Sequence, residues 1–433
     1  NRVPTMIWGG WADNYMNTVA ALVEHSPAPT KGVVGPWVHQ YPHQAVPGPA
    51  IGFLQEAVRW WDRWLKDLPN GAEDDPVMRV YMLQSAPPDP SAAYRDGHWA
   101  AETVWPSPAV ARSVLALSPG GLLGGAGGAL AVPVRTPQHL GLHAGEFFPM
   151  GLNAEMPGDQ RADDALSVCF DGAALEAPLD LMGAAVLRLR VSSDQPLAFL
   201  VARLCDAGPD GSSVRIAHGM LNLCNRKSRE TPERMVPGRA EQVEIVLDQM
   251  AYRLAPGHHL RLALSTTYWP FLWPSPEAAT VTVMEGVLDL PVHQGSVAEW
   301  EPPAPEGAAS WAHRVLRDGR AERRVETDLI GETVSLVIGD DLGRVENLTH
   351  GLIVEEGMEE RWTVHPDDPL SAEVAIRWNQ SHARGDWSVR TEATARMTAS
   401  ATALRMQATL TAWEGEDEVF RRDWDETVAR QFV

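Results

Sequence analysis

The sequence pattern changes near residue 75, and this change constrains the fold more than any other feature. Before it, two short apolar runs, "VPTMIW" and "KGVVGPW", are each followed by residues at helical spacing. The first helical set is Tyr15, Val19, Leu22 and Val23, and the second extends from Phe53 to Leu68. Strand, helix, strand, helix is typical of a parallel α/β sheet, so residues 1–75 are predicted to form part of one.

From residue 76 onward the chain consists of short runs rich in Val, Leu and Thr, separated by Pro, Gly, Asp and Ser. Many short strands between turn residues predict an antiparallel sandwich or jelly roll over residues 76–298. A proline-rich break, "EWEPPAPEGAAS", then precedes further strand-like runs, which predict a β-rich extension over residues 299–433. The predicted fold class is therefore mostly β, with an α/β part at its beginning.

Composition excludes several classes of partner. The 433 residues carry a net charge of −21, and nucleic acids and anionic membrane surfaces both require clustered Lys and Arg. No apolar run reaches the roughly 18 residues that span a bilayer. Three cysteines without CxxC spacing predict neither a disulfide framework nor a zinc site, which favours a reducing, cytoplasmic location. No cofactor is indicated, and a homo-oligomer remains open.

Two residues carry the functional prediction. Asp13 follows the first predicted strand, and His39 follows the second, 26 positions later with one helix between them. In a parallel sheet both residues would lie at the carboxyl ends of neighbouring strands, where open α/β sheets keep their active sites. Asp13 could also simply cap the helix that follows it. A carboxylate beside a histidine is two-thirds of a nucleophile, base and acid triad.

The order of these residues implies that the nucleophile lies elsewhere. Hydrolases of the α/β type present nucleophile, acid and histidine in that order, so a chain that begins with the acid is expected to lack its nucleophile. No serine lies in a GxSxG motif. Ser118 in "ALSPG" is rejected because it lies in a β-rich region, and because Pro119 has no N–H for an oxyanion hole.

The chain resembles the serine hydrolases of the cocaine esterase and X-prolyl dipeptidyl-peptidase family, known as the CocE/NonD type. The similar stretches in the first 75 residues are "GGWADNY", "GPWVHQYP" and "FLQEAVRWWDRWLKD". In the second part they are residues 199–226 and 251–274, which are similar to the jelly-roll domain of that family. The resemblance extends from residue 1 to about residue 290.

The resemblance implies a serine α/β-hydrolase that acts on esters, amides or peptides, with Asp13 as the triad acid and His39 as the general base. It implies that the serine, the oxyanion hole and the lid lie in an amino-terminal catalytic part outside these residues. Trp11 and Trp37 flank the two residues and are candidates for the substrate site. By analogy with the family, Trp269 in "TTYWPFLWP" is a third candidate.

Three alternatives compete with this interpretation. His39 and His43 have metal-ligand spacing, but Pro42 prevents the helix that would align them, so no metal is predicted. A β-rich chain could be a binding module for sugars or proteins. It could also be an inactive homologue retained for assembly. The residues encoded before Asn1 would discriminate among these classes, because an active hydrolase requires a nucleophile there.

Overall fold

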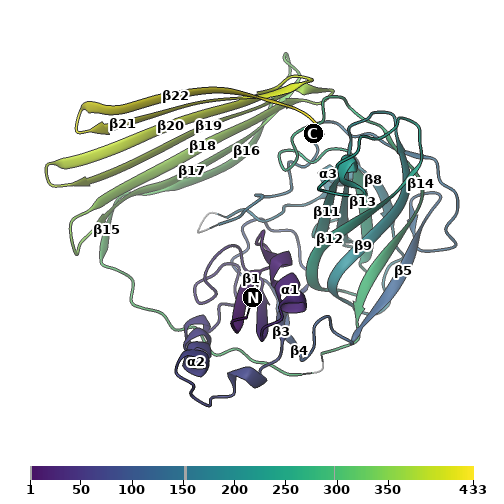
Figure 1. Ribbon diagram of the computed structural model, residues 1–433, viewed down its shortest axis with the longest axis horizontal. Coiled ribbons are helices and arrows are strands. Elements are labelled where there is room, and N and C mark those ends of the chain that lie inside the picture. The colour runs from purple at the N-terminus through teal and green to yellow at the C-terminus, as the bar shows by residue number, and fades with distance from the viewer. Residues whose placement is uncertain (1, 151–153, 297) are drawn as a thin grey trace.

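The computed structural model describes residues 2–150, 154–296 and 298–433, and these residues form two β-sheets and few helices (Figure 1). The first sheet has 14 strands and the second has eight. This arrangement confirms the predicted mostly β fold class. Within the described residues, no helix combines the length and apolar character needed to cross a membrane.

The first 75 residues form the predicted strand–helix alternation. The elements are β1 (Thr5–Gly10), α1 (Met16–His25), β2 (Thr30–Gly35), α2 (Phe53–Leu65) and the 3-10 helix η1 (Ala72–Asp74). Strands β1 and β2 pair in parallel. Helix α1 covers this sheet because Val19, Ala20 and Val23 recur on one face, and all three are buried. A side chain at Gly32 of β2 would collide with this helix, 2.8 Å from Val23.

The middle of the chain is a β-sandwich. Its strands are β3 (Met78–Gln84), β4 (Gly97–Glu102), β5 (Val110–Ser118), β6 (Leu122–Leu123), β7 (Val132–Val134), β8 (Val168–Asp171), β9 (Leu179–Ser193), β10 (Phe199–Ala207), β11 (Ser213–Asn222), β12 (Glu241–Leu254), β13 (His259–Ser265) and β14 (Val281–His293). The short helices α3 (Arg161–Ala165) and η2 (Leu223–Asn225) interrupt it. Alternating apolar residues of β9 and β10 meet in one buried core, as a sandwich requires.

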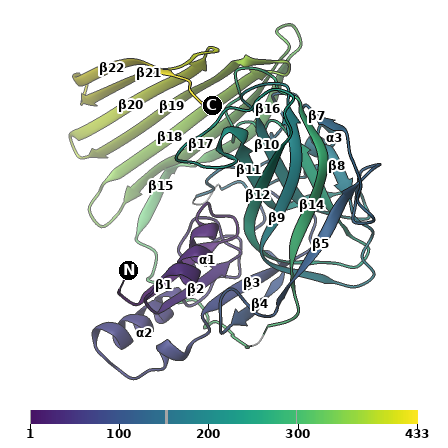
Figure 2. The same cartoon turned by 45° about the vertical axis from the view of Figure 1, so that its right-hand side comes forward.

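The sandwich is joined to the α/β part by continuous hydrogen bonding. Strand β3 pairs in parallel with β2 at its start, through Met78–Val80, and with β12 at its end, through Leu83 and Gln84. The sheet therefore runs through the predicted boundary at residues 75 and 76 without a break. This continuity fixes the position of the β1–β2 loops relative to strands β11 and β12 (Figure 2).

The last part of the chain is an antiparallel sheet of long strands. They are β15 (His313–Arg317), β16 (Arg320–Asp328), β17 (Thr333–Asn347), β18 (Ile353–His365), β19 (Asp368–Arg384), β20 (Trp387–Ala399), β21 (Ala403–Glu414) and β22 (Asp417–Ala429). From β17 to β22 each strand pairs with the next one in sequence, which makes a meander. We refer to these eight strands as the C-terminal sheet.

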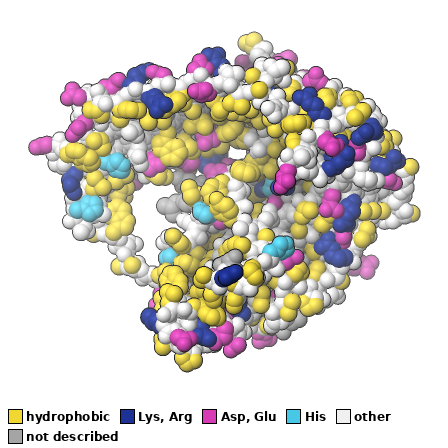
Figure 3. Space-filling model, in the orientation of Figure 1, with side chains coloured by type: hydrophobic (Ala, Val, Ile, Leu, Met, Phe, Trp, Pro, Cys, Tyr) yellow, Lys and Arg dark blue, Asp and Glu magenta, His cyan; other side chains and the backbone are white. Residues whose placement is uncertain are grey.

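The C-terminal sheet packs against the sandwich at one end and arches over the α/β part. Trp269 of the sandwich is packed against Val364 and Ala372 of this sheet. Away from that contact, Figure 3 shows hydrophobic side chains along the inner side of the sheet, facing a hollow above the α/β part. Trp378 lies on this sheet with 44 % of its surface exposed.

Candidate active site

The structure brings Asp13 and His39 together. Because β1 and β2 are parallel and in register from Thr5 to Gly10, the residues that follow them leave the sheet at the same edge. The His39 Nδ1 atom lies 2.8 Å from Asp13 Oδ2, which is hydrogen-bond distance. Asp13 is buried at 6 % exposure, whereas 40 % of the His39 side chain is exposed. The pair thus combines a shielded carboxylate with an accessible imidazole.

The Asp13 carboxylate is held from its other side by the backbone. The Tyr15 N–H donates to Asp13 Oδ1 at 2.9 Å, and the Asp13 N–H donates to the Gly10 carbonyl at 3.1 Å. Helix α1 begins at Met16 with Tyr15 as its N-cap residue, so Asp13 is not the helix cap that its sequence position allowed. The Asp13 side chain stabilises a tight turn there, because Oδ1 accepts from the Tyr15 N–H within the turn. The other oxygen, Oδ2, faces His39.

A segment that sequence reasoning missed supports the His39 ring. The backbone N–H of His39 donates to the Pro149 carbonyl at 3.0 Å, and the Phe148 ring centroid lies 4.7 Å from that of the His39 ring. The Tyr15 ring centroid lies 5.6 Å from that of His39 and 5.6 Å from that of Phe148, so the three rings form one cluster. The compact run "EFFPM" at 146–150 is the only signal for this contact in the sequence. We refer to residues 146–150 as the His39 support segment.

These contacts leave one ring nitrogen of His39 for chemistry. Nδ1 faces Asp13, and no hydrogen bond joins Nε2 to another residue in the described ranges. An imidazole bonded to a carboxylate through Nδ1 presents Nε2 as the atom that can take a proton from a nucleophile.

Of the two tryptophans beside the pair, Trp11 lies at a cavity and Trp37 is a packing residue. Trp37 is 1 % exposed and donates from Nε1 to the Pro49 carbonyl at 2.9 Å. Its backbone approaches β1 so closely that a Cβ atom on Gly10 would lie 1.9 Å from the Trp37 oxygen. Trp11 donates from Nε1 to the Tyr81 carbonyl at 2.7 Å and lines the same cavity as Asp13.

This cavity, of about 110 Å³, lies between the Asp13 turn and the sandwich. Asn17 of α1 spans the junction, donating to Asp248 Oδ1 at 2.8 Å and accepting from the Gln249 N–H at 2.8 Å. The Asp248 carboxylate also meets His218 Nδ1 at 2.7 Å. The sandwich is therefore bonded to the first turn of the helix that follows Asp13, and this link was not predicted.

Trp269, the third candidate from the sequence, lies elsewhere. It is 1 % exposed and packs edge-on against Trp362 of the C-terminal sheet, with ring centroids 5.7 Å apart. It is absent from the cavity beside Asp13, whereas Phe271 from the same aromatic stretch does line that cavity. An aromatic residue in a sequence indicates burial but not its partner, and in this stretch Phe271, not Trp269, lies at the cavity.

Ser118 is bonded within its own loop, and burial raises the pKa of each of the three cysteines. The Ser118 hydroxyl donates to the Gly124 carbonyl at 3.1 Å and accepts from the Gly127 N–H at 3.1 Å. Burial raises the pKa of Cys169 to about 11 and that of Cys205 to about 12, so both thiols stay protonated at neutral pH. Burial also raises the pKa of Cys224.

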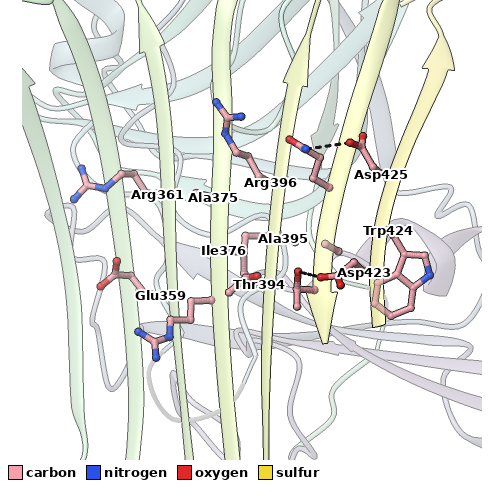
Figure 4. Close-up of a pocket in the computed structure, with 14 residues that line it drawn as sticks. Glu359, Arg361, Ala375, Ile376, Thr394, Ala395, Arg396, Asp423, Trp424 and Asp425 are labelled. Carbon is pink, nitrogen blue, oxygen red and sulfur yellow. Dashed lines mark hydrogen bonds between the residues drawn. The ribbon is translucent and has the colours of Figure 1, made fainter. Parts of the chain in front are cut away.

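A larger groove of about 710 Å³ crosses the C-terminal sheet, and most of its charged side chains form ion pairs (Figure 4). Arg396 bonds Glu373 at 2.6 Å, and Asp425 bonds Arg405 on the neighbouring strand at 2.5 Å. No histidine belongs to the described residues that line it. Cross-strand ion pairs of this kind stabilise a sheet, and the lining, within the described residues, shows no pairing of a carboxylate with a histidine like that of Asp13 and His39.

Comparison with known families agrees with this geometry. Residues 70–326, more than half of the chain, match the family described as the X-Pro dipeptidyl-peptidase C-terminal non-catalytic domain. Residues 1–41, which include Asp13 and His39, match the X-Pro dipeptidyl-peptidase (S15 family).

Individual relatives are similar over the same region. Cocaine esterase of Rhodococcus sp. (strain MB1 Bresler) is 24 % identical over 298 residues, which cover 62 % of this chain and 49 % of the esterase. A putative serine esterase of Mycobacterium bovis is 22 % identical over 289 residues, covering 60 % of this chain and 44 % of that protein. The chain thus spans about half the length of these curated relatives.

Solved structures share the fold. An alpha-amino acid ester hydrolase superimposes with a TM-score of 0.53 at 19 % identity, covering 67 % of this chain and 56 % of that one. An aminopeptidase from a Thaumarchaeota archaeon gives a TM-score of 0.51 at 19 % identity, covering 68 % and 55 %. The family match over residues 70–326 shows that the chain belongs to the X-Pro dipeptidyl-peptidase C-terminal non-catalytic domain family.

Proposed function

We propose that this chain supplies the acid, Asp13, and the base, His39, of a Ser–His–Asp hydrolase whose serine lies outside these 433 residues. The observation that carries the proposal is the 2.8 Å contact between the two side chains at the carboxyl ends of adjacent parallel strands. In this proposal residues 1–75 complete the catalytic domain, residues 76–298 form the jelly roll, and residues 299–433 form the extension.

The proposed mechanism follows from the two ring nitrogens of His39. Nδ1–H donates to Asp13, which fixes the tautomer and leaves Nε2 to accept the serine proton as the hydroxyl attacks an acyl carbon. The resulting imidazolium lies beside the buried carboxylate, which stabilises it. His39 then returns the proton from Nε2 to the leaving alcohol or amine, and water repeats the sequence on the acyl-enzyme.

The proposed substrates are acyl esters, amides or peptides. Cocaine esterase, the alpha-amino acid ester hydrolase and the X-Pro dipeptidyl-peptidase family support this range by their names. The competing proposal is a chain kept only for assembly, but a pure binding module would not need a buried carboxylate aimed at an accessible imidazole. A cytoplasmic location belongs to the proposal and is supported by the unpaired cysteines among the described residues.

A covalent probe tests the proposed function. The complete protein is expected to react with a fluorophosphonate, because the base-activated serine of such a hydrolase attacks phosphorus as it would attack an acyl carbon. Peptide mass spectrometry should locate the label on one serine outside these 433 residues. Labelling of Ser118, or of any other serine within them, would contradict the proposal. So would a complete protein that neither reacts nor hydrolyses p-nitrophenyl esters, amino-acid esters or X-Pro anilides.

A further inference from the structure

The His39 support segment is itself held by Glu155 and by Phe271 of the sandwich. The Glu146 N–H donates to the Glu155 carbonyl at 3.0 Å, and this bond ties the start of the segment to residue 155. Phe147 packs edge-on against Phe271 of the sandwich, with ring centroids 5.3 Å apart. The two glutamate side chains at this junction point to the C-terminal sheet, where they share one partner.

That partner is Arg323 of β16. Its Nη2 bonds the Glu146 carboxylate, and its Nε lies 3.3 Å from Glu155 Oε2. The same guanidinium meets Asp340 of β17 at 3.0 Å, so it joins the C-terminal sheet to the support segment. Only 16 % of the Arg323 side chain is exposed, which makes these charge-assisted contacts stronger than a surface ion pair.

The group around Arg323 contains one cation, its guanidinium, and three carboxylates, those of Glu146, Glu155 and Asp340. Burial raises the pKa of Glu146 and of Glu155, while Arg323 partly opposes that rise and Asp340 adds to it. His143 is the other titratable group that acts on Glu155, and it lowers that pKa. The support segment therefore depends on Arg323, because without the guanidinium the carboxylates would repel one another in a half-buried position.

The raised pKa of Glu155 predicts a pH effect on stability. The folded protein holds this proton more tightly than the unfolded chain does, so the free energy of unfolding falls as pH rises through the window above 4.5. Glu155→Gln should therefore raise the midpoint of thermal unfolding at pH 7.5 and change it little at pH 4.5. The control is Glu392→Gln, which removes an exposed partner of Arg377. A lowered midpoint for Glu155→Gln at pH 7.5 would contradict this prediction.

We propose that Arg323 is a positioning residue for His39, through which the C-terminal sheet sets the geometry of the active site. The path is continuous: Arg323 holds Glu146 and Glu155, these anchor the support segment, and Phe148 and Pro149 of that segment hold the His39 ring and backbone. The inference rests on the proposed function, because it assigns a role to residues around the proposed base.

Steady-state kinetics of the complete protein test this inference. Arg323→Met keeps an unbranched apolar stem but removes the guanidinium and its charge. It is expected to lower kcat about 10- to 100-fold with KM changed less than twofold, since a small displacement of a catalytic group slows chemistry more than binding. Arg323→Lys should restore part of kcat, because it keeps a cation beside the two glutamates. The rate of fluorophosphonate labelling should fall in parallel with kcat.

The matched control is Arg396→Met, which removes an arginine of the same sheet whose partner, Glu373, belongs to that sheet. Its kcat should stay at the wild-type value. An Arg323→Met protein with wild-type kcat overturns the positioning role even if His39→Ala is inactive. If His39→Ala retains full activity, the proposed function fails instead. Loss of kcat in both arginine variants, or equal losses for Arg323→Met and Arg323→Lys with a lowered unfolding midpoint, would show a general structural effect and also overturn the inference.

Discussion

Replacement of His39 by alanine in the complete protein is expected to lower kcat by three orders of magnitude or more, while the unfolding midpoint stays at its wild-type value. The imidazole is the group that removes the serine proton, and its side chain is 40 % exposed, so its loss costs chemistry rather than packing. Asp13→Asn should lower kcat by about 10⁴, because an amide cannot stabilise the imidazolium and favours the wrong tautomer. Hydrolysis of a p-nitrophenyl ester measures both effects.

His43→Ala is the matched control for this experiment. His43 lies in the same loop as His39, and its ring stacks on Phe53 at 5.8 Å without any carboxylate partner among the described residues. Its replacement should leave kcat within a few-fold of wild type. If His39→Ala and His43→Ala hydrolyse the ester at the same rate as wild type, His39 is not the general base.

The proximity of Asp13 and His39 could be predicted because it follows from local patterns in the first 40 residues. Two apolar runs with one amphipathic helix between them specify a parallel pair of strands, and such a pair places the residues after each strand at one edge. The exact start of α1 could not be predicted. Asp13 is a favoured N-cap residue, but its carboxylate bonds His39 instead, so tertiary contact overrides the local preference.

Contacts between residues far apart in the chain were beyond sequence reasoning. Phe148 and Arg323 follow His39 at long separations, and neither lies in a pattern that specifies its partner. Trp269 illustrates the same difficulty for a residue that was singled out from the sequence. Its aromatic stretch predicted a wall of the substrate site, but the indole fills the junction with the C-terminal sheet. Residue type predicts whether a side chain is buried, whereas the residues that it contacts depend on the topology of the whole chain.

The largest effect on stability is expected from Arg203 of β10, which is fully buried at 0 % exposure. Its guanidinium bonds Asp164 at 3.0 Å, Gln160 at 2.9 Å and Ser167 at 2.9 Å. Arg203→Met would leave Gln160 and Ser167 without this donor, and Asp164 would keep Arg261, at 3.3 Å, as its remaining cation. The loss is expected to be about 3 kcal/mol, at the lower end of the range for breaking a buried ion pair, because Arg261 still pairs with the carboxylate.

Denaturant unfolding of the complete protein, followed by tryptophan fluorescence, measures this loss as a lower midpoint for the transition of the sandwich. Arg188→Met provides the control on β9, which pairs with β12 and β14; there the arginine is 49 % exposed and pairs with Glu244 at 2.9 Å. That variant should lose less than about 1 kcal/mol, as exposed ion pairs do. Because both variants replace an arginine by methionine, the difference between their free-energy losses measures the effect of burial. Similar losses in the two variants would show that the Arg203 network contributes no more than a surface pair.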